Sequence, residues 1–130
     1  MKSIKSLACI KSFRPKPLTE ESHTALAKAL KHFTLNNTHL VYKHQFDGAK
    51  YLDVLDKMNR IGLIADRMDH HPEWTLQANT LTIGLSTHEI GGEVSFKDYV
   101  LGYWIEEILN EKPMEDNMVE KWNNLNISYD

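Results

Sequence analysis

The strongest chemical pattern in this sequence of 130 residues is a set of three histidines with acidic neighbours. His70 and His71 stand side by side, and His88 follows a stretch that alternates like a strand. An imidazole has an ordinary pKa of about 6.5, so it both gives and takes protons near neutral pH and suits general acid–base catalysis. Asp66 lies one helical turn before His70, and Asp98 follows His88. Both carboxylates are candidates to orient or charge an imidazole.

The same residues also have purely structural interpretations. Histidines at a helix end can hydrogen-bond the last free carbonyls and complement the helix dipole. Asp66 and His70 have the spacing of an ordinary i,i+4 pair. Asp98 follows Ser95 by three residues, which is typical of a capping box. His88 alone fits a surface position at a strand end.

A zinc site is the main chemical alternative for this cluster. Three histidines and a carboxylate can bind zinc. Adjacent side chains such as those of His70 and His71 usually diverge on an extended segment, however, and the His-x-x-x-His spacing of helical zinc sites is absent. Cys9 is the only cysteine, which excludes an internal disulfide and a cysteine-based zinc site. We therefore expect no metal.

Helical and strand patterns alternate along the first half of the chain. Thr19 is a good N-cap for an apolar stripe that ends at Phe33, which predicts a first helix over residues 19–33. Alternation over residues 40–46 predicts a half-buried strand. Residues 34–35 begin a shorter strand that pairs with it.

The second half repeats this order. Apolar residues recur at three- and four-residue steps from Tyr51 to Met68, which predicts a long helix that lies on a sheet. Residues 74–78 and 80–87 alternate as a strand pair, and Ser95 begins a last helix. The prediction is an α+β fold, in which an antiparallel four-stranded sheet has helices packed on one face in the order α-β-β-α-β-β-α.

Composition and charge are those of a globular domain. Hydrophobic residues make up 42% and charged residues 25% of the chain, which excludes a disordered chain or a fibre. The net charge of −3 argues against direct nucleic-acid binding, and no apolar run approaches the ~18 residues of a membrane-spanning helix. We divide the chain into a basic arm (1–17), one domain (18–112) and a polar extension (113–130). The arm is either an added edge element of a cytoplasmic protein or an organelle-targeting segment.

Taken together, the spacing resembles the signature of the pterin-4a-carbinolamine dehydratase family. That signature joins an acidic residue, a His-His-Pro segment, an aromatic residue, a further histidine and a later aspartate. The positions that carry it here are Asp66, His70, His71, Pro72, Trp74, His88 and Asp98. The likeness is dense over residues 58–105 and continues more loosely back to Thr19.

The resemblance implies a hydro-lyase that needs neither metal nor organic cofactor. Its members dehydrate 4a-hydroxytetrahydrobiopterin to quinonoid dihydropterin, in the recycling of the pterin that aromatic amino acid hydroxylases use. Carried over, His70 and His88 are the two acids, one for each face of the pterin, and His71 mainly holds the substrate. Asp66 orients His70, and Asp98 steers the tautomer of His88.

Two aromatic residues are further substrate-binding candidates. Trp74 either walls the pocket or packs in the core. Family members usually carry a tryptophan just after the first helix, and Phe33 stands there in this chain. Altered stacking on the substrate is the expected consequence.

The resemblance also leaves a second class of function open. Some family members bind a homeodomain transcription factor through a helix surface, so a non-enzymatic interaction module of the coactivator type, which would add a nuclear location, is the alternative. Members commonly form dimers or tetramers. A candidate face for assembly consists of Leu101, Trp104, Ile105 and Ile108, although burial within one chain explains these residues as well.

Overall fold

The computed structural model describes residues 15–36 and 38–110. Its elements follow the predicted order, with a short 3-10 helix, η1, before the last helix. They are α2 (Glu20–Ala27), β1 (Thr34–Asn36), β2 (His39–Gln45), α3 (Tyr51–Met68), β3 (Glu73–Gln77), β4 (Thr80–Leu85), η1 (His88–Ile90) and α4 (Phe96–Leu109). Most of the predicted basic arm and nearly all of the predicted C-terminal extension lie outside the described residues.

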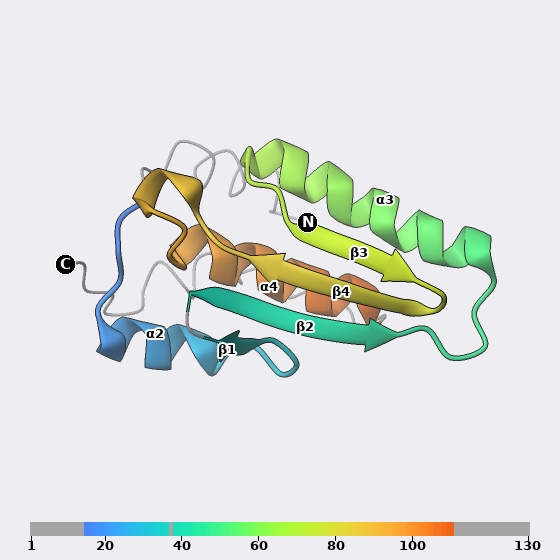
Figure 1. Cartoon of the computed structure of the whole chain (residues 1–130), viewed down its shortest axis with the longest axis horizontal. Coiled ribbons are helices and arrows are strands. Elements are labelled where there is room, and N and C mark those ends of the chain that lie inside the picture. Colours follow the sequence, from blue (N-terminus) through green and yellow to red (C-terminus); the bar gives the residue numbers. More distant parts are fainter. Residues whose placement is uncertain (1–14, 37, 111–130) are drawn as a thin grey trace.

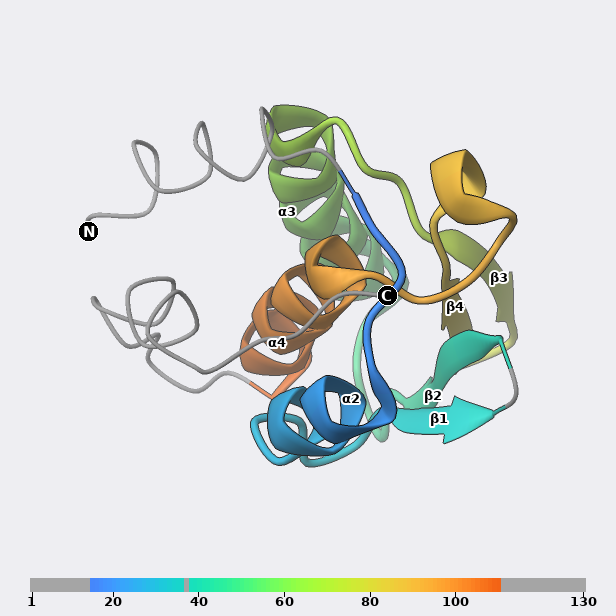
Figure 2. The same cartoon turned by 90° about the vertical axis from the view of Figure 1, so that its left-hand side faces the viewer.

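The four strands form one antiparallel sheet in the order β1-β2-β4-β3. Strand β2 pairs with β4 from Leu40 opposite Leu85 to Gln45 opposite Thr80. Figure 1 shows the strands side by side, and Figure 2 shows the three helices on one face of the sheet, with α4 between α2 and α3. The predicted α+β fold is therefore confirmed.

The core lies between this sheet and the helices. Leu81, Ile83 and Leu85 alternate along β4 and are fully buried, as a strand with one covered face requires. Helix α4 is buried along almost its whole length, including the residues that we considered for an assembly face: Leu101, Trp104, Ile105 and Ile108. These side chains belong to the core of the chain. No helix among the described residues is long and apolar enough to span a membrane.

Helix α2 ends at Ala27, six residues before the predicted end. The cause is Glu106 of α4, whose side chain is only 6% exposed. Its carboxylate accepts hydrogen bonds from the backbone N–H groups of Lys31, His32 and Phe33 at 2.8, 2.7 and 2.8 Å. Three consecutive N–H groups that point at one carboxylate cannot also bond to carbonyls of a preceding helical turn. The segment before β1 is therefore held as a loop.

Candidate active site

The first two histidines follow the C-terminus of α3, where the chain makes a Schellman turn. Asp69 takes the left-handed conformation, with φ of 52°, which aspartate tolerates better than most residues. The N–H groups of Asp69 and His70 bond back to the carbonyls of Asp66 and Ala65, both at 3.0 Å. The helix end therefore fixes the backbone of His70, and His71 begins the segment that leads into β3.

His88 lies just beyond β4, at the start of a loop that is closed by backbone hydrogen bonds. Thr87 forms an isolated β-bridge with Glu93, and the N–H of Thr87 is 2.8 Å from the carbonyl of Glu93. Gly91 and Gly92 have φ of 74° and 85°, which glycine adopts at little steric cost. The loop leaves the His88 side chain exposed to solvent.

A buried carboxylate joins these two places. Asp98 Oδ1 is 2.5 Å from Nε2 of His70, and Asp98 Oδ2 accepts a hydrogen bond from Thr87 Oγ1 at 2.6 Å. The N–H of Ser95 donates to the same Oδ2 at 2.8 Å. The exposed fractions of Asp98 and His70 are 0% and 7%. Because three donors bond this carboxylate, its ionised form is stabilised in the protein interior.

The contact with Asp98 brings the three histidines to one end of the sheet. His71 follows His70 directly and His88 follows Thr87 directly, so two exposed histidines flank the buried His70–Asp98 pair. Figure 1 shows the C-terminal end of α3 and the η1 turn at the same end of the sheet. The arrangement offers one imidazole held by a carboxylate and two that reach solvent, which suits proton transfer to and from a bound molecule.

Comparison with known proteins assigns this arrangement to a family. The family model described as pterin 4 alpha carbinolamine dehydratase matches residues 16–108. The chain belongs to this family.

Two curated relatives of the pterin-4a-carbinolamine dehydratase family come from two strains of Prochlorococcus marinus, and both are named "Putative pterin-4-alpha-carbinolamine dehydratase". The relative from strain MIT 9303 is 35% identical over 75 residues, which cover 58% of this chain and 76% of the relative. The relative from the other strain is 31% identical over 96 residues, which cover 74% of this chain and 97% of the relative.

A solved structure of the same fold comes from Brucella melitensis and is described as a transcriptional coactivator/pterin dehydratase. It superposes with a TM-score of 0.65 at 23% sequence identity, and the match covers 72% of this chain and 98% of the Brucella chain. At this identity the likeness supports the fold alone.

The carboxylate that contacts His70 in this family member is Asp98, whereas the sequence predicted Asp66. An i,i+4 pair would require His70 to continue the helix, but the left-handed Asp69 ends it one residue earlier. Within the described residues, the exposed Asp66 side chain makes no hydrogen bond to His70. Asp98 was in turn expected to orient His88, but its bonded partners are His70, Thr87 and Ser95.

The two aromatic candidates lie in or against the core. Phe33 is 6% exposed, and its ring packs edge-on against Tyr42 with centroids 5.3 Å apart. We therefore assign Phe33 to the core rather than to substrate stacking. Trp74 is partly buried against the core from β3, opposite Ile83, so of its two predicted roles core packing has direct structural support.

Sequence reasoning missed Thr87, and it treated Ser95 only as a cap. The predicted capping box is present, since Ser95 and Asp98 bond to each other's backbone. That box was a usable signal, because it turns the Asp98 carboxylate back toward the loop before α4, where Thr87 lies. Nothing in the local sequence indicated that His70 would meet it there.

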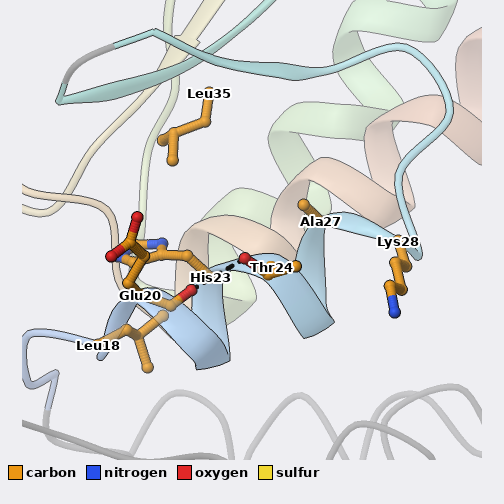
Figure 3. Close-up of a pocket in the computed structure, with 7 residues that line it drawn as sticks. All are labelled: Leu18, Glu20, His23, Thr24, Ala27, Lys28 and Leu35. Atoms are coloured by element: carbon orange, nitrogen blue, oxygen red, sulfur yellow. Dashed lines mark hydrogen bonds between the residues drawn. The ribbon is translucent and has the colours of Figure 1, made fainter.

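No group of three or more His, Cys, Asp or Glu side chains in residues 15–36 and 38–110 is arranged to hold a metal ion. A separate groove of about 630 Å³ lies along α2, and its lining includes Leu18, His23, Lys28 and Leu35. Figure 3 shows these side chains around the groove. The lining of this groove comes from α2 and its flanks, so the groove is distinct from the histidine cluster.

Proposed function

We propose that this chain is a hydro-lyase that dehydrates pterin-4a-carbinolamines such as 4a-hydroxytetrahydrobiopterin to the quinonoid dihydropterin. The observation that carries the proposal is the buried contact between His70 and Asp98, flanked by the exposed His71 and His88. Membership of the family supports dehydration of a pterin carbinolamine as the reaction. The product would then be reduced in the recycling of tetrahydrobiopterin after aromatic amino acid hydroxylation.

The chemistry requires only two proton transfers. The C4a hydroxyl is a poor leaving group until an imidazolium protonates it. The C4a–O bond then breaks and water leaves, while the lone pair of the adjacent ring nitrogen forms a double bond to C4a. A neutral imidazole takes the proton that this nitrogen loses, so the protein ends with the protons with which it began. Positioned proton transfer accelerates such a step by about 10²–10⁴-fold.

The three histidines divide this work according to their surroundings. His70 and His88 are the proposed acid–base residues, because they come from two different elements and can reach the two faces of a flat ring. Asp98 stabilises the imidazolium form of His70 through their hydrogen bond. His71 is the proposed substrate-holding residue, since it is exposed beside His70 and no carboxylate of the described residues hydrogen-bonds its ring.

A rate assay on the synthetic carbinolamine tests the proposal. The substrate decays spontaneously, so the ultraviolet absorbance change is followed with and without the purified protein. We expect an acceleration proportional to protein concentration and independent of added chelator. A folded protein that leaves the spontaneous rate unchanged would exclude the enzyme. Stoichiometric zinc, together with loss of rate on chelation, would exclude the imidazole mechanism.

A protein-interaction role is the second candidate, and the surface of α3 favours it. Leu52, Leu55 and Leu63 are 75%, 38% and 57% exposed, and their spacing puts them on one side of the helix. Exposed apolar stripes of this kind mark interaction sites. The alternative proposal is a coactivator-type module or a homo-oligomer, either a dimer or a tetramer, that uses this face.

Light scattering on wild type and on a Leu52→Gln/Leu63→Gln double variant tests this second role. We expect the wild type to assemble and the double variant to be smaller, with dehydratase activity measured in parallel. A monomeric wild type would rule out assembly through α3. Assembly without any dehydration would favour the module over the enzyme.

A further inference from the structure

The side chains of Ser95, Thr87 and Asp98 form a hydrogen-bonded chain that has only one possible direction. Thr87 Oγ1 carries a single proton, and this proton is donated to Asp98 Oδ2 at 2.6 Å. The same Oγ1 lies 2.7 Å from Ser95 Oγ, so Thr87 must accept there and Ser95 must donate. All three residues have an exposed fraction of 0%, so bulk water does not compete for these bonds.

The other oxygen of Asp98 extends this chain to His70. An ionised carboxylate only accepts, so the 2.5 Å contact between Oδ1 and Nε2 places a hydrogen on Nε2. In the neutral imidazole this leaves the lone pair on Nδ1. Within the described residues no hydrogen bond reaches Nδ1, while the backbone N–H of His70 is already bonded to Ala65.

We propose that Thr87 is a positioning residue, which acts through Asp98 to hold His70 as the Nε2–H tautomer, so that His70 exchanges protons with the substrate through Nδ1. This inference rests on the proposed dehydration and names the atom that performs it. Without the Thr87 hydroxyl, Oδ2 keeps only the bond from the Ser95 N–H, and the Ser95 hydroxyl loses its acceptor. The carboxylate can then rotate about its Cβ–Cγ bond, and Nε2 of His70 loses a fixed partner.

Nuclear magnetic resonance of the protein labelled with ¹⁵N-histidine tests the tautomer directly. The ring signals of His70 are identified by their loss in His70→Gln, and they are recorded at a pH where the ring is neutral. We expect the pattern of a proton on Nε2, with a hydrogen that exchanges slowly. A proton on Nδ1 would overturn the inference. This measurement needs no turnover, so its result stands even if the carbinolamine proves not to be the substrate.

Thr87→Val and Thr87→Ser test the positioning role. Loss of one hydrogen bond to a buried charge should lower kcat by about tenfold and leave KM nearly unchanged in Thr87→Val. Its His70 spectrum should show a mixture of tautomers, and Thr87→Ser should restore most of kcat and the single tautomer. An unchanged kcat and spectrum in Thr87→Val would refute the role, and so would a loss that serine fails to rescue. If Thr87→Val does not fold, the wild-type spectrum still decides whether Nδ1 is the reacting atom.

Discussion

The imidazole of His70 contacts the carboxylate of Asp98 at 2.5 Å, although the two residues are 28 positions apart. This contact ties the C-terminal end of α3 to the first turn of α4. Thr87 Oγ1 bonds to the same carboxylate, so the loop that begins with His88 is tied to them as well. The catalytic histidines that we propose therefore share one buried anchor.

Asp98→Asn and Asp66→Asn decide which carboxylate supports His70. Removing the charge of Asp98 leaves donors that face each other, so we expect a loss of about 3 kcal/mol in the free energy of unfolding and a fall of about 100-fold or more in kcat. The exposed Asp66 lacks such a contact, and its variant should stay close to wild type. Urea unfolding and the carbinolamine assay measure both effects, and the reverse ranking would restore the sequence-based assignment.

His88→Ala should lower kcat by about 100-fold while the free energy of unfolding changes by less than about 0.5 kcal/mol. The reason is that His88 is exposed and outside the core. His32→Ala, which removes an exposed histidine before β1, is the matched control for activity. Normal turnover in His88→Ala would remove His88 from the mechanism.

His71→Ala should raise KM by about tenfold and change kcat far less, because a residue that only holds substrate supplies binding in the ground and transition states alike. Initial rates over a range of carbinolamine concentrations separate the two constants. A lowered kcat with an unchanged KM would instead assign His71 to proton transfer.

Glu106→Gln should destabilise the fold without affecting catalysis. The amide offers donors where the carboxylate accepted three backbone N–H groups, so we expect a loss of about 2–4 kcal/mol in the free energy of unfolding. Urea titration measures it, and Glu89→Gln, at an exposed site in η1, is the control. Equal stability of the two variants would show that the Glu106 contacts do not hold the segment before β1.

Stability should fall in mild acid partly because of His44. Its pKa is lowered from the ordinary value of 6.5 by burial, by the charge of Lys57 and by His32, while Asp47 acts in the opposite direction. The Tyr42 hydroxyl, 2.6 Å from Nδ1, is its hydrogen-bond partner. The unfolded chain therefore binds a proton more readily, so this contribution is present above pH 6.5 and is lost as the pH falls through the lowered pKa.

Melting temperatures measured from pH 7.5 to pH 5 check this sign. His44→Gln should show a smaller loss on acidification than wild type, and His39→Gln should behave like wild type. An identical pH profile in His44→Gln would assign the acid sensitivity to other groups.

The sequence predicted the elements well because their patterns are local. The apolar stripe from Tyr51 to Met68 and the alternation along β4 each appear within a few turns or pleats, and both elements are present. The early end of α2 was not predictable in this way. It depends on Glu106, which lies 73–75 residues further along the chain.

The same distinction applies to the candidate site. Residue types and spacing were enough to select the three histidines and Asp98. Local spacing also favoured Asp66 as the partner of His70, and it was misleading, because one left-handed residue at Asp69 ends the helix before the pair can form. Which carboxylate meets which imidazole is set by the packing of α4 against the ends of α3 and β4.

The most direct test of convergence on one substrate is a crystal structure of the protein with a bound, stable reduced pterin. We predict the pterin ring between His70 and His88, with Nδ1 of His70 within hydrogen-bond distance of the ring edge at C4a and its adjacent nitrogen, and with His71 in contact with the ligand. A pterin bound elsewhere, such as in the groove along α2, or one that none of these imidazoles touches, would contradict the proposed function.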